Sequence, residues 1–192
     1  MKQIGAGAEA IIYLDKNKVI KKRLKKNYRI KEIDEALRKT RTRVESKILE
    51  KIPVKAPKIV STDRKENIEM EFIEGQKIRD LLDKRPELAK EIGKKVAAMH
   101  NAGIIHGDLT TSNMILKEEI YFIDFGLSFF SEKLEDKAVD IHLFKQALES
   151  KHYRVAEKAF KEFLKGYSKA KNYKNIMNRF KIVEERGRYK KK

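Results

Sequence analysis

The chain has 192 residues, a formal net charge of +17 and 41% hydrophobic residues, a length that fits one domain or two small lobes sharing a cleft. The lack of cysteine excludes a disulfide framework and a thiolate metal site. No apolar run approaches a membrane span, and the first residues lack the apolar segment of a signal peptide. We therefore expect a soluble protein of the reducing cytoplasm with no membrane partner.

The positive charge is concentrated at the two ends of the chain. Residues 1–60 contain 18 Lys and Arg against 7 Asp and Glu, residues 61–150 contain 13 against 18, and residues 151–192 contain 15 against 4. Thermophilic proteins are often rich in charged residues of both signs, which does not explain an excess of one sign at the ends. A polyanionic partner does explain it, and nucleic acid is the partner that this distribution favours.

A loop near the N-terminus has the composition of a phosphate-binding turn. Glycine lets backbone N–H groups approach an anion closely, and we expect Gly5, Gly7 and Glu9 to contact a nucleotide. A dinucleotide-binding turn is the alternative, which needs a strand before Gly5 and a helix after the loop. The residues that follow instead alternate as in a β-hairpin with its tip at residues 15–17, which favours a loop between two strands.

A lysine and a glutamate can form an ion pair beside that loop. Lys21 lies in the second strand of the expected hairpin, where alternation from Val19 favours it over Lys22. Glu45 flanks the apolar stripe of the helix that follows. That stripe, at helical spacing, consists of Ile33, Leu37, Val44, Ile48 and Ile52. We predict that Glu45 holds Lys21 against nucleotide phosphates; otherwise Lys21 is one solvated lysine among many.

The segment between this strand and the helix, and the helix itself near residues 38–45, are unusually basic for the flank of an active site. The basic residues form either a solvated face or a docking surface for a protein partner or RNA, and we favour docking.

Residues 68–73 are expected to form a strand that leads to a hinge at Glu74 and Gly75. Met70 would then lie beside an adenine ring, and the Glu71 carbonyl and the Ile73 amide would hydrogen-bond it. The next helix can begin near Pro86. Its buried stripe is formed by Leu88, Ile92, Val96 and Met99, and it ends at residues 101–103.

The candidate catalytic residues lie in the stretch from 106 to 126, HGDLTTSNMILKEEIYFIDFG. Residues 114–116 and 121–123 read as two short buried strands, and a hairpin of these strands would bring Asn113 and Asp124 side by side. Their oxygens suit Mg²⁺, which shares its coordination with phosphate oxygens. Asp108 is then left to accept a proton from an attacking hydroxyl or water. Asp-x₄-Asn followed by Asp-Phe-Gly is the catalytic half of a protein-kinase-type phosphotransferase.

Each of these motifs alone is often accidental, because Asp and Asn are ordinary turn residues. Together, and flanked by apolar strands, they favour a kinase-like site. The segment after Gly126 is short and lacks the activation segment that cradles a peptide substrate in conventional kinases. Gly107 stands where an arginine would pair with an activation-loop phosphate. We expect Asp140, on the next helix, to brace the catalytic loop.

Two amphipathic helices are expected within residues 152–183. Their apolar residues are Ala156, Phe160, Phe163, Leu164 and Tyr167 in the first and Ile176, Phe180 and Val183 in the second. The tail from residue 184 to 192 is too polar to fold alone and is a candidate nucleic-acid arm.

With these features in place, nearly the whole chain resembles the small atypical kinase/ATPase subunit of the KEOPS (EKC) complex, the PRPK-type family. The most specific parts are NYR at 27–29, TRTRVE at 40–45, HGDLTTSN at 106–113 and RGR at 186–188.

The resemblance implies an α+β, two-lobed, protein-kinase-like fold. A small β-rich N-lobe with one main helix would span residues 1–74, and a reduced, mainly helical C-lobe would span residues 75–192. It also implies Asp108 as the catalytic residue, Asn113 and Asp124 as Mg²⁺ ligands, and Lys21 and Glu45 as the pair that positions ATP.

The same resemblance implies a place beside the KEOPS subunit that transfers the threonylcarbamoyl group to the tRNA adenosine next to the anticodon. We expect the chain to act there as a regulatory Mg-ATP-dependent Ser/Thr kinase or ATPase, contacting tRNA through its basic N-terminal insertion and tail. The alternatives are a free-standing kinase similar to the RIO group and a non-catalytic tRNA-binding scaffold. A small-molecule kinase of the aminoglycoside type would leave the basic ends unexplained.

Overall fold

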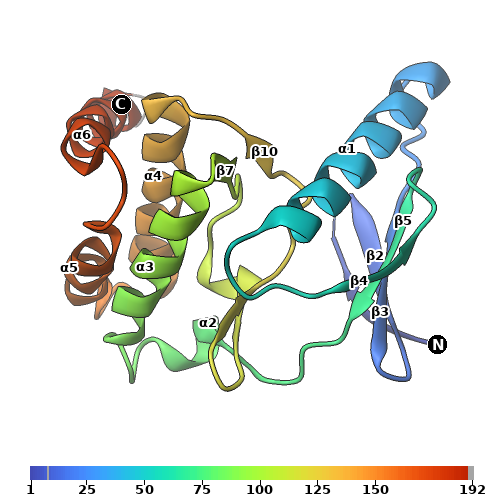
Figure 1. Ribbon diagram of the computed structural model, residues 1–192, viewed down its shortest axis with the longest axis horizontal. Coiled ribbons are helices and arrows are strands. Elements are labelled where there is room, and N and C mark those ends of the chain that lie inside the picture. Colours follow the sequence, from blue (N-terminus) through green and yellow to red (C-terminus); the bar gives the residue numbers. More distant parts are fainter. Residues whose placement is uncertain (8, 190–192) are drawn as a thin grey trace.

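The computed structural model describes residues 1–7 and 9–189. The N-terminal part forms a β-sheet crossed by one long helix, and the C-terminal part is mainly helical and lies beside it (Figure 1). The α+β, two-lobed fold expected from the sequence is therefore confirmed. The predicted division between residues 74 and 75 stays a prediction.

The N-lobe is a five-stranded antiparallel sheet with the strand order β1-β2-β3-β5-β4. Its strands are β1 (Lys2–Ala6), β2 (Ala10–Asp15), β3 (Lys18–Arg23), β4 (Ile59–Thr62) and β5 (Asn67–Glu71). Strands β2 and β3 form the expected hairpin, with Ile12 opposite Lys21 and Lys16 at φ 53° in its tip. The candidate phosphate-binding loop thus joins two strands and is followed by no helix, which excludes a dinucleotide-binding turn.

Helix α1 (Lys31–Lys51) crosses the sheet and extends beyond it at its N-terminal end (Figure 1). Ile48 is fully buried, but Ile33 is 52% exposed, so the prediction that Ile33 belongs to the buried stripe is wrong. In this half of α1 the buried side chains are polar ones, Asp34 and Thr42. The Asp34 carboxylate accepts hydrogen bonds from the Lys26 amide at 3.1 Å and from Arg38 Nε at 2.8 Å.

The C-lobe combines short strands and turns with four longer helices that pack in pairs. In chain order it contains β6 (Gln76–Lys77), α2 (Ile78–Leu81), α3 (Leu88–Asn101), β7 (Ile104–Ile105), the 3₁₀ turn η1 (Thr111–Asn113), β8 (Met114–Leu116), β9 (Ile120–Phe122), β10 (Phe129–Phe130), α4 (Leu134–Lys151), α5 (Ala156–Tyr167) and α6 (Tyr173–Tyr189). Helix α5 packs on α3 and α6 packs on α4, and both lie on the side remote from the N-lobe (Figure 1). Helices α5 and α6 correspond to the two amphipathic helices that the sequence predicts within residues 152–183.

Helices α3 and α5 approach each other so closely that each presents a glycine to the other. A Cβ atom built on Gly93 would lie 2.1 Å from the Phe163 carbonyl oxygen, and one on Gly166 would lie 2.0 Å from the Lys90 carbonyl oxygen. Neither position can hold a side chain without moving a helix backbone. This contact anchors α5 to α3, the helix that leads into the catalytic loop.

Helix α6 continues to Tyr189, so the first part of the tail that is expected to be too polar to fold alone is helical, with support from α4. The helix is held against α4 by buried Phe180 and by Arg179 and Arg186, which contact the Glu135 carboxylate at 2.8 and 2.7 Å. Residues 190–192 lie outside the described part of the chain. Within that part, no helix is both long and apolar enough to cross a bilayer.

Candidate active site

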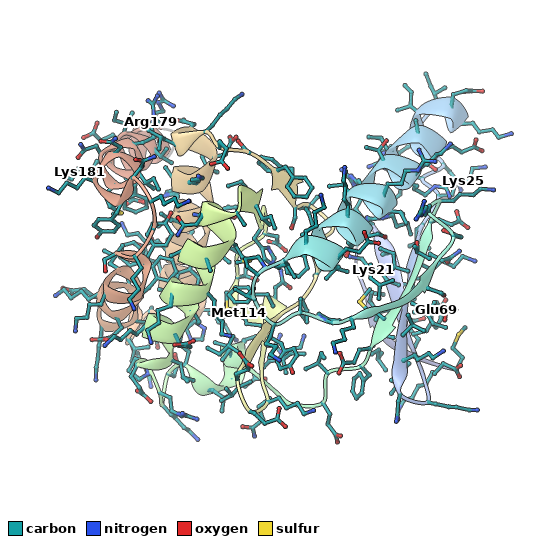
Figure 2. The ribbon with its side chains drawn as sticks, viewed as in Figure 1. Lys21, Lys25, Glu69, Met114, Arg179 and Lys181 are labelled. Atoms are coloured by element: carbon teal, nitrogen blue, oxygen red, sulfur yellow. The ribbon has the colours of Figure 1, made fainter. Side chains whose placement is uncertain are left out.

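The predicted ion pair forms where α1 crosses the sheet. Lys21 is 6% exposed, and its Nζ lies 2.6 Å from Glu45 Oε1 and 2.7 Å from Asp124 Oδ1. Figure 2 shows Lys21 beneath α1, on the side of the N-lobe that faces the C-lobe. Burial lowers the pKa of Lys21, but the nearby Glu45 and Asp124 carboxylates outweigh it and raise the pKa above its usual value. Lys21 is thus a fixed cation that links the two lobes.

A buried arginine completes this ion pair and is absent from the sequence-based prediction. Arg23, 4% exposed, donates from Nη2 to Glu45 Oε2 at 2.5 Å and from Nε to Thr42 Oγ1 at 3.1 Å. Strand alternation could have found it, because Lys21 and Arg23 are two residues apart on β3 and face the same side. Lys22 between them is exposed, which resolves the choice between Lys21 and Lys22.

The hairpin of β8 and β9 brings together the residues predicted at its two ends. Met114 pairs with Phe122, and the Ile123 amide donates to the Asn113 carbonyl at 2.9 Å. Asn113 and Asp124 therefore lie at the same end of the hairpin and line one cavity. Asn113 Nδ2 donates to the Asp108 carbonyl at 2.9 Å and to Asp108 Oδ2 at 2.8 Å. Asp108, Asn113 and Asp124 thus come together as the sequence predicts.

The catalytic loop is held by a buried carboxylate on α4. Asp140 is 1% exposed and accepts hydrogen bonds from the backbone amides of His106 at 3.0 Å and Gly107 at 2.9 Å. Burial alone would raise the pKa of Asp140, but a hydrogen bond from His100 helps to keep it below its usual value. The expected bracing role of Asp140 is confirmed.

Gly107 is required by the shape of this loop. Its φ is +77°, and a Cβ there would lie 2.4 Å from the Leu127 carbonyl oxygen, so an arginine at this position is excluded. Only seven residues, 127–133, separate Gly126 from the start of α4. Phe129 and Phe130 of this segment form β10, which pairs with β7, the strand that leads into the catalytic loop.

An apolar cavity of about 310 Å³ lies between the lobes. Its apolar walls are formed by Ile4, Ile12, Val19, Met70, Ile115 and Ile123, and Lys21, Glu45, Asn113 and Asp124 line its polar side. Glu71 and Ile73, whose backbone groups are predicted to hydrogen-bond the adenine, also line it. Within the described residues, the Ile73 amide has no backbone partner, which leaves it able to hydrogen-bond a planar ring. Such a mainly apolar slot with few polar groups is typical of a nucleotide-base site.

A second, polar cavity of about 250 Å³ shares Lys21 and Asp124 with the first. Its lining residues are Gly7, Glu9, Ala10, Lys21, Arg23, Arg41, Asp108, Asp124, Gly126 and Leu127. Gly5 and Gly7 flank these cavities, and a Cβ on either would meet nothing closer than 3.6 Å. The backbone of this loop therefore does not need glycine for its own packing, which is consistent with close approach by a ligand. Ala8 lies outside the described residues.

The donor set fits Mg²⁺ bound together with phosphates. No group of three or more His, Cys, Asp or Glu suited to a metal occurs within residues 1–7 and 9–189, and Mg²⁺ commonly needs only one or two carboxylates plus substrate phosphates. Asp124 is one such carboxylate. Although burial raises its pKa, Lys21 lowers it below the usual value, so the group is ionised. Asn113 uses Nδ2 for Asp108, which leaves Oδ1 for a cation.

Comparison with known proteins gives one consistent family. The RIO-domain family model matches residues 12–138. The chain is 43% identical over 213 residues to the KEOPS complex subunit Bud32 of Pyrococcus abyssi, covering 99% of the chain and 97% of that protein. It is 38% identical to the serine/threonine-protein kinase BUD32 homolog of Archaeoglobus fulgidus, covering 95% and 94% of the two chains.

A longer relative matches through only part of its length. The bifunctional tRNA threonylcarbamoyladenosine biosynthesis protein of Methanobrevibacter smithii is 43% identical, and the match covers 97% of this chain but 36% of that protein.

Proposed function

This chain belongs to the Bud32 family of RIO-domain proteins, and from that premise we propose that it is a Mg-ATP-dependent Ser/Thr kinase and ATPase of tRNA threonylcarbamoyladenosine biosynthesis. One observation carries the enzymatic part of this proposal. Lys21, Asn113, Asp108 and Asp124 converge on two adjoining cavities, one apolar and one polar and charged. That pairing suits an adenine ring followed by a phosphate chain.

Each residue then has a defined task. The Ile73 amide and the Glu71 carbonyl would hold the base, and Lys21, fixed by Glu45, would contact the α and β phosphates. Asn113 and Asp124 would hold Mg²⁺, which neutralises phosphate charge when it is bound. Gly5, Gly7 and Glu9 of the β1–β2 loop would border the phosphates.

Asp108 is the proposed base. Its carboxylate accepts the proton of a water or a Ser/Thr hydroxyl while the oxygen of that group bonds to the γ-phosphorus. The bond from that phosphorus to the oxygen bridging to the β-phosphate breaks, and ADP leaves with the electron pair. The hydrogen bond from Asn113 Nδ2 fixes the carboxylate for this step.

The acceptor is proposed to be water or a side chain of the chain's own assembly. The short segment at residues 127–133 offers no platform of the kind that holds peptides in conventional kinases. We propose that the threonylcarbamoyl-transferase subunit and the other KEOPS subunits are the partners, as the name of the Pyrococcus relative suggests. ATP turnover would regulate or reset the tRNA-modifying partner, in the cytoplasm where tRNA is found.

This proposal has a direct assay. The protein is purified from its native source with whatever subunits accompany it, and Mg²⁺-dependent ATP turnover is measured with and without them. Turnover that rises or falls with the transferase subunit supports a regulatory subunit of that assembly. Efficient phosphorylation of unrelated peptides by the isolated chain would favour a free-standing kinase instead.

Contact with tRNA is proposed through both basic regions. Figure 2 shows Lys25 at one end of the long axis of the molecule and Arg179 and Lys181 of α6 at the other. A bound tRNA would therefore contact two separate sites, and its phosphates would supply most of the binding free energy.

We predict that tRNA affinity falls steeply with salt and that deletion of residues 186–192 lowers both the affinity and the salt dependence. Each lost phosphate contact should reduce the slope of log K against log salt by about 0.7–0.9. Filter binding or fluorescence anisotropy between 50 and 200 mM salt, roughly the range where such effects are large, measures this. A tail in which Lys190, Lys191 and Lys192 are replaced by arginine is the charge-matched control. Binding that is indifferent to both salt and deletion would refute the tRNA proposal.

A further inference from the structure

A carboxylate of the β1–β2 loop is held between two arginines from the region of α1. Arg29 Nη2 donates to Glu9 Oε1 at 2.9 Å, and Arg41 Nη1 lies 2.9 Å from Glu9 Oε2. The hydrogen bond from Arg29 lowers the pKa of Glu9 below its usual value. Glu9 is therefore an anion, and it is clamped to a helix that is remote from it in sequence.

The location of this clamp is what suggests a function. Glu9 and Arg41 line the polar cavity, together with Lys21, Asp108 and Asp124. Arg29, which donates to the other oxygen of the carboxylate, is not among the residues that line the cavity. Arg41 thus brings a cation from α1 into the same small space as the proposed base, where the phosphoryl group would be transferred.

Two guanidinium groups around one carboxylate are an arrangement that also suits phosphate. The planar fork of arginine matches phosphate and carboxylate oxygens alike, and a phosphoryl group carries more charge and more acceptor oxygens than a carboxylate. The Glu9 side chain is 34% exposed, so it can leave towards solvent without being buried elsewhere. A stronger anion that enters the cavity can therefore take its place at Arg41.

We propose that Arg41 is a binding residue for the terminal phosphoryl group of the nucleoside triphosphate, and that the Glu9 carboxylate occupies it until the triphosphate displaces it. The inference rests on the proposed function, because it assumes that ATP binds in these two cavities. It adds that the loop carboxylate competes with the ligand, so that the pocket discriminates a triphosphate from a diphosphate through Arg41.

The alternative is that Glu9 and the arginines only fasten the loop to α1. The two readings differ in the sign of one effect. If Glu9 competes with phosphate, its neutralisation frees Arg41 and strengthens triphosphate binding. If Glu9 only fastens the loop, the same change loosens the loop and weakens binding.

The test is calorimetric titration of the full chain with Mg-ATP and Mg-ADP. Glu9→Gln should bind ATP several-fold more tightly than the native protein, with ADP affinity unchanged. Arg41→Ala should lose about 10-fold in ATP affinity but little in ADP affinity, as expected for one charged contact to the terminal phosphate. In the double variant, Glu9→Gln should have no further effect. Lys47→Ala, an equal charge loss at an exposed position of α1, is the matched control and should leave both affinities unchanged.

Weaker ATP binding by Glu9→Gln, or equal losses for ATP and ADP in Arg41→Ala, would overturn the inference. If Arg41→Ala does not fold, Arg41→Lys replaces it in the titrations. This variant keeps the positive charge but loses the planar guanidinium group that matches phosphate oxygens, and it is titrated alone and combined with Glu9→Gln. Failure of the native protein to bind ATP would instead refute the proposed function, so the two failures are distinguishable.

Discussion

Asp108→Ala is expected to lower ATP turnover by about 1000-fold, the usual contribution of a positioned general base, while ATP affinity stays near the native value. The Asp108 side chain lies in the polar cavity and does not line the apolar one, so its loss should remove proton acceptance without removing the base-binding walls. Asn113 keeps its hydrogen bond to the Asp108 backbone carbonyl, which preserves the loop.

Steady-state hydrolysis gives the turnover, and titration with ATP gives the affinity. Asp108→Asn keeps the shape of the side chain and should be nearly as slow. Asp80→Ala, at an exposed carboxylate on α2, is the control and should hydrolyse ATP at the native rate. Near-native hydrolysis by both Asp108 variants would remove this residue from the mechanism.

Glu45→Ala is expected to destabilise the fold by about 3–5 kcal/mol, the range found when one partner of a buried ion pair is removed. Glu45 is 1% exposed and is shared by Lys21 and Arg23, which are 6% and 4% exposed. Its removal leaves two buried cations without their common carboxylate. Lys21 should also lose its fixed position, so nucleotide affinity should fall together with stability.

Urea unfolding measures the change in the free energy of unfolding. Glu50→Ala, at an exposed glutamate of the same helix, should change it by less than about 0.5 kcal/mol. If Glu45→Ala unfolds at the native urea concentration, Lys21 and Arg23 have other adequate partners, and the ion pair is not the link between α1 and the sheet.

Local sequence patterns predict the site better than they predict its surroundings. The hairpin of β8 and β9 follows from two short apolar strands around a polar turn, and it is this hairpin that brings Asn113 next to Asp124. Lys21 follows from strand alternation. These features depend on residues close in sequence, so the alternation of side chains along each strand is enough to predict them.

The features that were missed depend on contacts between distant segments. The burial of Arg23 depends on Glu45 and Thr42 of α1, and the close approach of backbones at Gly93 and at Gly166 depends on how α3 meets α5. Strand alternation places Arg23 on the same face as Lys21 but does not identify its buried partners, and the close approach of the two helices has no signal in the helical period.

One expectation failed, and another needed the tertiary structure to be completed, because packing between elements overrides the local pattern. Ile33 has the helical spacing of a core residue but lies where α1 extends beyond the sheet, so no core exists for it to enter. The polar tail is expected not to fold alone, and the part of it in α6 is supported by α4 through Glu135 and through the packing of Phe180. Helix propensity and polarity are weak guides where such support exists.

The central claim is that Asn113 and Asp124 together hold the magnesium ion of a bound triphosphate while Asp108 stays available for the reaction. The most direct test is a crystal structure of the full chain with Mg²⁺ and a non-hydrolysable ATP analogue. We predict a metal ion bound by Asn113 Oδ1, the Asp124 carboxylate and phosphate oxygens, with the adenine between Met70 and Ile123. A metal ion bound by other residues would contradict this claim. So would an analogue bound outside the two adjoining cavities that Lys21 and Asp124 line.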